Sequence, residues 1–83
     1  MLTIDLRLVA NELTPGLKGG KYEIEDGATV LDLLALCEKE CGKQIPEGNL
    51  EFLYPLFNSR PVRLDTALAE SGTLHLCRAV TGG

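Results

Sequence analysis

The sequence predicts an α+β fold in which one main helix packs across one face of a mixed sheet of four to five strands. Three observations support this prediction. Apolar residues alternate with polar residues near the start of the chain, which is typical of strands with one buried face. Apolar residues then recur at helical spacing in residues 30–41. Further apolar segments follow, and strands on both sides of a single helix favour a mixed sheet.

The first two strands are predicted to form an antiparallel hairpin. In the first strand, the residues that share one face are apolar, namely Leu2, Ile4, Leu6 and Leu8. In residues 21–25, Tyr22 and Ile24 share one face in the same way. Residues 11–20 contain Pro15 and three glycines, so we expect a long turn between the two strands.

A helix is predicted from residue 30 to about Cys41. Thr29 can cap its start, with Asp32 in the capping-box position, and Gly42 can end it. One face carries an apolar stripe made of Val30, Leu33, Leu34, Cys37 and Cys41. The two cysteines lie one helical turn apart and could supply two metal ligands. On a core stripe, however, free cysteines usually act as small hydrophobic residues, and we expect that role here.

A second hairpin is predicted in the next part of the chain. Residues 50–57 are apolar and aromatic and are expected to form a strand, with Pro55 limiting that strand or marking a sheet edge. A turn near Asn58 then leads into a short strand at residues 62–64.

The last strand is predicted at residues 73–79. Before it, residues 65–71 are expected to form a short helical turn that Asp65 caps and from which Leu68 packs inward. The first and last strands are both rich in apolar residues, and one helical crossover separates them. They can therefore be parallel neighbours at the centre of the sheet. This is the β-grasp arrangement.

The sequence ends in Val-Thr-Gly-Gly at residues 80–83. Two terminal glycines are expected to stay mobile unless a partner holds them. Without Cβ atoms they could enter a narrow passage in another protein and present the carboxylate of Gly83 at its far end. We therefore assign residues 1–78 to a β-grasp domain and residues 79–83 to a flexible C-terminal tail. A frayed end or a cloning remnant is the alternative interpretation.

Composition limits the classes of function. The 83 residues suffice for one domain, and 45% hydrophobic with 24% charged residues indicate a folded globule. The net charge of −4 argues against a nucleic-acid partner, which normally requires a basic face. We expect no signal peptide, membrane span or membrane partner. Three cysteines without a disulfide pattern favour free thiols and a cytoplasmic location.

Several segments resemble a known family. Residues 73–76, followed by the terminal Gly-Gly, resemble the end of ubiquitin, and the whole chain resembles the bacterial sulfur carriers of the MoaD and ThiS families. Its length and the ending at residues 80–83 are closer to MoaD. The segment at residues 58–62 is similar to the family's Asn-Gly-x-x-Val turn, although Ser59 stands where glycine is usual. Residues 77–79 replace the Pro-Pro often found before the tail.

The resemblance implies that this chain carries no catalytic side chain and binds no cofactor. An ATP-dependent adenylating enzyme, similar to a ubiquitin-activating enzyme, would activate Gly83, and a sulfur donor such as a cysteine desulfurase would convert it to a thiocarboxylate. As a molybdopterin synthase small subunit, the chain would donate sulfur for molybdenum or tungsten cofactor synthesis at the synthase's large subunit. A ThiS-like role with thiazole synthase in thiamin synthesis, a ubiquitin-like modifier conjugated to lysines, and a pure interaction module remain alternatives.

The resemblance and the position of residues in the last strand together suggest site residues. Gly83 is the reactive residue, and the expected partner contacts are Arg78, Ala79, Val80, Thr81, Gly82, His75 and Cys77. The strand pattern itself places His75 and Cys77 on the face opposite the neighbouring leucines. There they could form part of a docking face, an incomplete ligand pair or plain surface. Arg78 could form an ion pair with the activating enzyme or remain a solvated charge.

Overall fold

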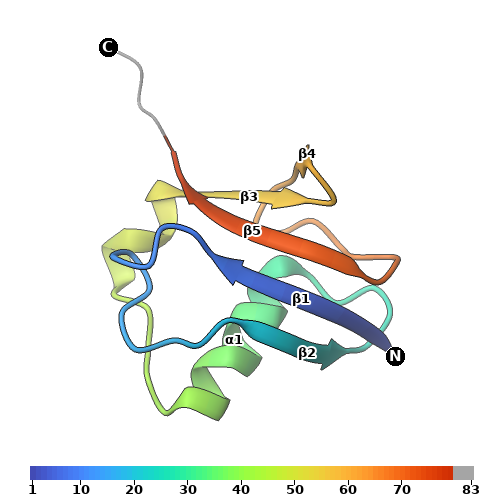
Figure 1. Ribbon diagram of the computed structural model, residues 1–83, viewed down its shortest axis with the longest axis horizontal. Helices are drawn as coiled ribbons and strands as arrows, with labels where there is room; N and C mark the ends of the chain where they lie inside the picture. The colour runs from blue at the N-terminus through green and yellow to red at the C-terminus, as the bar shows by residue number, and fades with distance from the viewer. Residues whose placement is uncertain (80–83) are drawn as a thin grey trace.

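The computed structural model describes residues 1–79, and these form a five-stranded mixed sheet with one α-helix across one of its faces (Figure 1). The strand order is β2-β1-β5-β3-β4. This architecture confirms the predicted fold class. The elements along the chain are β1 (Leu2–Leu8), β2 (Gly20–Ile24), α1 (Val30–Cys41), the 3-10 helix η1 (Glu47–Phe52), β3 (Leu53–Phe57), β4 (Arg60–Pro61) and β5 (Gly72–Arg78).

The centre of the sheet is the parallel pair β1 and β5, as predicted. In its register Leu6 lies opposite Leu74 and Leu8 opposite Leu76. On its other side β1 pairs with β2 in an antiparallel ladder, which confirms the first hairpin. Alternate β1 residues face the helix, and Ile4 and Leu6 are fully buried there. The first and last strands of the chain are therefore neighbours in the sheet.

Helix α1 begins and ends where its sequence predicts. The Thr29 hydroxyl accepts a hydrogen bond from the Asp32 amide at 3.1 Å, and the Asp32 carboxylate accepts one from the Thr29 amide at 2.9 Å. This reciprocal capping box satisfies two amides that the first turn leaves without helical partners. Gly42 adopts the left-handed conformation with φ of 66°, which costs glycine little and stops the helix.

The core lies between α1 and the sheet. Burying one large aliphatic side chain contributes about 1.5–3 kcal/mol, so this layer supplies most of the stability. Cys41, at the end of the predicted stripe, is only half-buried. The most deeply buried aliphatic side chains are Ile4, Leu6, Val30, Leu33, Leu34, Leu68, Leu74 and Leu76.

The second hairpin differs from its prediction at both ends. The first three residues of the segment 50–57 belong to η1, and the short strand is β4 at Arg60–Pro61 rather than residues 62–64. Asn58 and Ser59 have φ of 51° and 70°, and two consecutive positive values form the tight two-residue turn of a hairpin. This tight turn starts the return strand immediately, so the strand comes earlier than predicted.

Pro55 limits the pairing between β3 and β4. Its carbonyl accepts a hydrogen bond from the Val62 amide at 3.1 Å, so its backbone polar groups point toward β4. A proline has no N–H to donate on that side, and the ladder ends there. Pro55 lies within β3, which continues to Phe57 and has β4 beside it, so the proline limits the pairing with β4 rather than the strand itself.

Residues 65–71 do not form the predicted helical turn. Leu68 donates its amide to the Ala28 carbonyl at 2.8 Å and accepts the Gly27 amide at 2.9 Å. These bonds hold the segment extended beside the start of α1, which a helical turn would not allow. Asp65 therefore caps no helix and instead forms an exposed ion pair with Arg63. The inward packing of Leu68 is confirmed, because this side chain is buried.

Candidate partner-binding site at the end of strand β5

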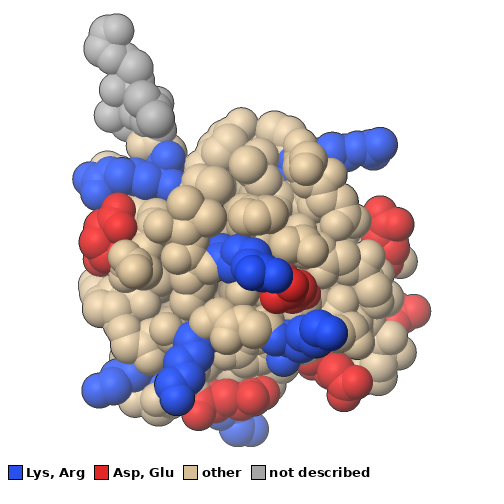
Figure 2. Space-filling model, viewed as in Figure 1, with Lys and Arg blue, Asp and Glu red and all other residues tan. Residues whose placement is uncertain are grey.

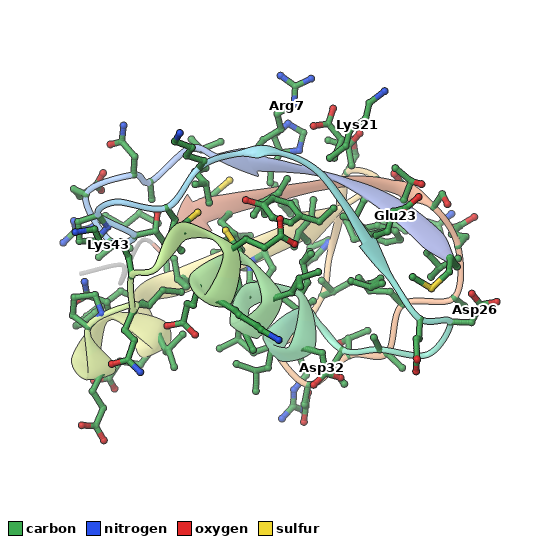
Figure 3. All side chains as sticks on the ribbon, turned by 90° about the horizontal axis from the view of Figure 1, so that it is seen from below. Arg7, Lys21, Glu23, Asp26, Asp32 and Lys43 are labelled. Atoms are coloured by element: carbon green, nitrogen blue, oxygen red, sulfur yellow. The ribbon has the colours of Figure 1, made fainter. Side chains whose placement is uncertain are left out.

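Strand β5 separates core residues from candidate site residues by simple alternation. Leu74 and Leu76 are fully buried beneath α1. His75 and Cys77 are half-buried on the opposite face of the sheet, which no helix of the described residues covers. Figure 3 shows α1 on one side of the sheet and the side chains of Arg7 and Lys21 projecting from the other. The predicted orientation of His75 and Cys77 is confirmed.

The neighbouring strands surround Cys77 with apolar side chains. Tyr54 of β3 lies directly opposite Cys77, and Leu56 lies opposite His75. Val9 follows Leu8, whose partner in β5 is Leu76, so Val9 lies at the end of β1 near the end of β5. We call Val9, Tyr54, Leu56 and Cys77 the apolar patch. Val9 is 60% exposed and Tyr54 is 43% exposed, which is high for residues of this type.

Charged side chains border the apolar patch. On the uncovered face, uncharged groups extend over β3 and β5, whereas charged groups gather over β1 and β2 (Figure 2). Asp5 and Arg7 of β1 form an ion pair at 2.9 Å there. An apolar area with a polar rim is the usual composition of a protein–protein interface.

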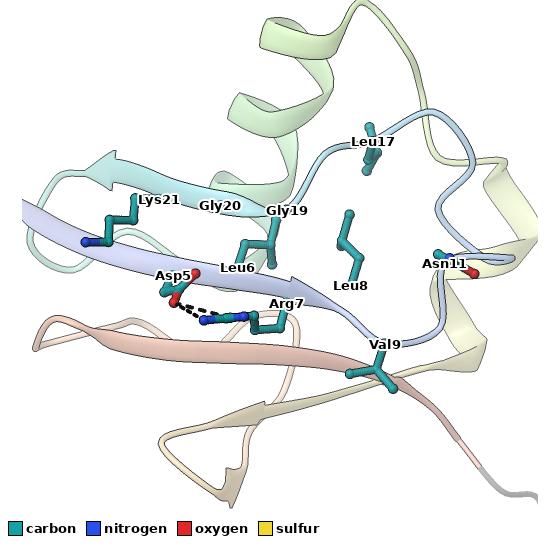
Figure 4. A pocket seen from close by; sticks show the side chains of 10 residues that line it. All are labelled: Asp5, Leu6, Arg7, Leu8, Val9, Asn11, Leu17, Gly19, Gly20 and Lys21. Carbon is teal, nitrogen blue, oxygen red and sulfur yellow. Dashed lines mark hydrogen bonds and ion pairs between the residues drawn. The ribbon is translucent and has the colours of Figure 1, made fainter.

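A shallow hollow of about 710 Å³ lies beside the second half of β1 and shares Val9 with the apolar patch. Figure 4 shows Leu8 and Leu17 on one side of the strand and Val9 on the other. Lys21 and the paired Asp5 and Arg7 add charge to its wall. A partner that contacts Val9 can therefore reach both the apolar patch and this hollow.

Arg78 lies at the end of β5, and its guanidinium contacts a carboxylate of this same chain. Its Nη1 atom is 3.4 Å from Oε1 of Glu12, which belongs to the loop after β1. Both side chains are more than half exposed, and such surface pairs contribute about 0–1 kcal/mol. Neither sequence interpretation of Arg78 included Glu12. The pair is weak enough for an acidic group of a partner to replace Glu12.

Ala79 is the last residue that the structure describes. Its amide donates a hydrogen bond to the Phe52 carbonyl of η1 at 2.7 Å. The backbone is therefore tied to the folded domain as far as residue 79. The remaining predicted site residues, Val80, Thr81, Gly82 and Gly83, lie outside the described residues, and the proposed boundary between residues 1–78 and 79–83 stays a prediction.

The two helix cysteines share a hydrogen-bond network rather than an open ligand site. The Cys37 thiol donates to the Tyr22 hydroxyl at 3.1 Å, and the Cys41 sulfur is 3.9 Å from the same hydroxyl. The Tyr22 hydroxyl in turn donates to the Lys18 carbonyl at 2.6 Å. Burial raises the pKa of the Cys37 thiol and of the Tyr22 phenol above their ordinary values. Both groups are therefore protonated at neutral pH.

Within residues 1–79, no group of three or more His, Cys, Asp or Glu side chains is placed to hold a metal ion. Over the same residues, no helix has the length and apolar character needed to cross a membrane.

Solved structures of other proteins are similar to this chain, whereas sequence comparisons find no match. No family model matches the sequence, and no curated protein matches it. A designed protein based on ubiquitin aligns with a TM-score of 0.61 and 20% identity over 98% of this chain and 92% of its own. The fold is the ubiquitin-like β-grasp.

Two natural proteins share this ubiquitin-like β-grasp. A Pyrococcus furiosus protein described as molybdopterin converting factor subunit 1 has a TM-score of 0.65 and 18% identity, covering 96% of this chain and all of its own. Small archaeal modifier protein 1 of Haloferax volcanii has a TM-score of 0.67 with the same identity and coverage. At this identity the likeness concerns the fold. It agrees with the resemblance to MoaD-like carriers seen in the sequence.

Proposed function

We propose that this chain is a sulfur carrier whose terminal Gly83 is adenylated and converted to a thiocarboxylate. The sulfur would serve molybdenum or tungsten cofactor synthesis, with this chain as the small subunit of a molybdopterin synthase. One observation supports this most. The central strand β5 is followed, after Ala79, by the final Val-Thr-Gly-Gly segment, and the apolar patch lies beside the end of this strand. The likeness to the Pyrococcus protein described as a molybdopterin converting factor subunit adds to it.

The chemistry requires activation from outside this chain. A terminal carboxylate, with an ordinary pKa of about 3.5, is ionised at neutral pH and is a poor electrophile. Its oxygen attacks the α-phosphorus of ATP, which releases pyrophosphate and forms an acyl adenylate. A persulfide of the donor then attacks the acyl carbon and displaces AMP, which gives an acyl disulfide. A thiol reductant cleaves its S–S bond, so that the thiocarboxylate is released and the donor cysteine ends in a disulfide with the reductant. The chain contributes the acyl group and its position, and the activating enzyme contributes the catalytic groups.

The apolar patch and Arg78 have complementary tasks in this proposal. The patch would dock on the activating enzyme or the synthase and fix the direction in which residues 80–83 leave the domain. Arg78 would exchange its weak pair with Glu12 for a carboxylate of the partner. Because Ala79 is hydrogen-bonded to η1, docking would also fix the starting point of the tail.

A second candidate is a lysine-conjugated modifier. The likeness to a small archaeal modifier protein favours keeping it. Its first step, adenylation of Gly83, is the same, and the acyl group then forms an amide with a lysine instead of transferring sulfur. A ThiS-like role in thiazole synthesis differs only in the acceptor of the sulfur.

Replacing Tyr54 with alanine tests the docking role of the patch. Tyr54→Ala should raise KM for adenylation of the chain by about tenfold, since interface aromatic residues commonly contribute more than about 1 kcal/mol. The kcat should change little, because Tyr54 does not contact the reacting carboxylate in this proposal. The measurement is pyrophosphate release by the host's adenylating enzyme at varied carrier concentration.

Leu31→Ala is the matched control for this experiment. Leu31 is an apolar residue of α1 with 41% exposure, close to that of Tyr54, but on the helix side of the molecule. Its replacement should leave KM unchanged. Equal KM values for Tyr54→Ala and wild type would remove the patch from the activation step.

A further inference from the structure

Strand β2 forms one edge of the sheet, and its outer side has no partner strand within residues 1–79. Gly19 is packed so closely on β1 that an added Cβ would be 2.7 Å from the Leu6 carbonyl oxygen, so this carbonyl faces β2. Leu6 pairs with Gly20 and Ile4 with Tyr22 in the ladder. These are therefore the pairs that exchange hydrogen bonds.

The alternate residues of β2 consequently direct their backbone groups away from β1. Lys21 and Glu23 lie between the hydrogen-bonded positions, so their N–H and C=O groups point outward along the edge. Tyr22 and Ile24 anchor the strand, because their side chains are buried in the core. The edge is thus a fixed row of backbone donors and acceptors, which is a template for a further strand.

Two neighbouring outward positions of this edge, Lys21 and Glu23, carry opposite charges. Lys21 and Glu23 are both exposed, and within residues 1–79 neither forms a salt bridge. Both are labelled in Figure 3, where the Lys21 side chain projects from the sheet face opposite α1. Successive outward positions along β2 and just beyond it are therefore occupied by glycine, lysine, glutamate and glutamate, at residues 19, 21, 23 and 25.

We propose that the β2 edge pairs with the β2 edge of a second copy of this chain, antiparallel and centred on Tyr22. In this register Lys21 of each copy lies opposite Glu23 of the other, and both residues present the outward backbone groups that such a pair exchanges. The pairing forms four backbone hydrogen bonds and two cross-strand pairs of opposite charge. Opposite charges stabilise directly facing strand positions, whereas like charges destabilise them.

Neighbouring registers are less favourable, which makes the proposal specific. Centring the pairing on Lys21 places two lysines opposite each other. Centring it on Glu23 places Lys21 opposite Glu25 but also two glutamates opposite each other. Centring it on Tyr22 produces no like-charged pair, because Glu25 then faces Gly19. The charge order of the strand therefore selects one register.

The helix side of the edge also suits a second copy. Leu36 of α1, half-buried, lines a hollow with Tyr22, Glu40 and residues of β1 and β2. A two-fold axis beside Tyr22 makes the hollows of the two copies face each other. The apolar patch contains no residue of β2, so pairing leaves it accessible. The proposal is therefore independent of the sulfur-carrier function.

Charge exchange tests the pairing in the full chain. Sedimentation equilibrium up to about 1 mM should show a dimer for the wild type, and the dissociation constant should rise at least about tenfold in Lys21→Glu and in Glu23→Lys. The double variant K21E/E23K should restore the dimer, because it exchanges the charges of both facing pairs. An equimolar mixture of the two single variants should form heterodimers. Lys21→Glu has glutamate at both facing positions and Glu23→Lys has lysine at both, so each facing pair in the heterodimer joins opposite charges.

Arg60→Glu provides the control. Arg60 is exposed on β4 at the opposite edge, and its replacement changes the net charge as much as Lys21→Glu does. This variant should dimerise like the wild type, and circular dichroism should show that all variants are folded. A monomeric wild type at the highest concentration, or single variants that dimerise as well as the wild type, would overturn the proposal. Failure of the mixed single variants to associate would overturn it too.

Discussion

Removing Gly82 and Gly83 is expected to reduce adenylation of the chain by more than about a hundredfold, since a displacement of 1 Å can already cost that factor. The truncated chain would present the carboxylate of Thr81, about 7 Å short of its original reach along an extended backbone. Pyrophosphate release by the host's adenylating enzyme measures the effect. A chain extended by two residues after Gly83 should fail equally, because its carboxylate is displaced in the opposite direction.

Stability provides the control for the truncation. The sheet hydrogen bonds, the core and the contact between Ala79 and Phe52 all lie within residues 1–79, so truncation leaves them intact. The free energy of unfolding should change by less than about 0.5 kcal/mol. Adenylation of the truncated chain at the wild-type rate would contradict the assignment of Gly83 as the reactive residue.

Leu74→Ala should produce a large loss of stability, because Leu74 is one of the two fully buried leucines of β5. Leu74 is fully buried and lies between Leu6 of β1 and Phe57 of β3. Truncating a buried leucine to alanine leaves a cavity and costs about 2–5 kcal/mol. For a domain of this size the midpoint of thermal unfolding should fall by roughly 8–40 °C. Urea and thermal unfolding followed by circular dichroism measure both quantities.

His75→Ala is the matched control for this substitution. His75 is the next residue of the same strand but lies half-buried on the uncovered face. Its replacement should cost less than about 1 kcal/mol, as expected away from the core. Equal losses for Leu74→Ala and His75→Ala would mean that the stabilising layer is not the one between α1 and the sheet.

Local sequence signals were sufficient for most of the fold. Alternation over residues 2–8 identifies β1, and the capping box with Gly42 defines both ends of α1. These signals depend on residues within a few positions of one another. The helical turn predicted at residues 65–71 is wrong because distant backbone groups at Gly27 and Ala28 decide its conformation. The strand predicted at residues 62–64 is wrong because a tight turn at residues 58–59 starts the return strand earlier.

The candidate site was predictable only in part, for a related reason. Alternation within β5 identifies the exposed face of His75 and Cys77. Val9 and Tyr54 belong to the same surface only because of the pairing of β1 and β3 with β5, and this register cannot be read from one segment. The pairing of Arg78 with Glu12 joins residues that are 66 positions apart. It follows from the parallel arrangement of β1 and β5, which brings the loop after β1 to the end of β5 (Figure 1).

The intact mass of the protein purified from its own host tests the central claim most directly. A sulfur carrier should show a species heavier than the sequence mass by the difference between one sulfur and one oxygen atom, and a peptide map should place this gain at Gly83. This species should disappear when the adenylating enzyme is deleted. If Gly83 is instead recovered only in branched peptides joined to lysine, or carries no modification under any growth condition, the sulfur-carrier function is contradicted.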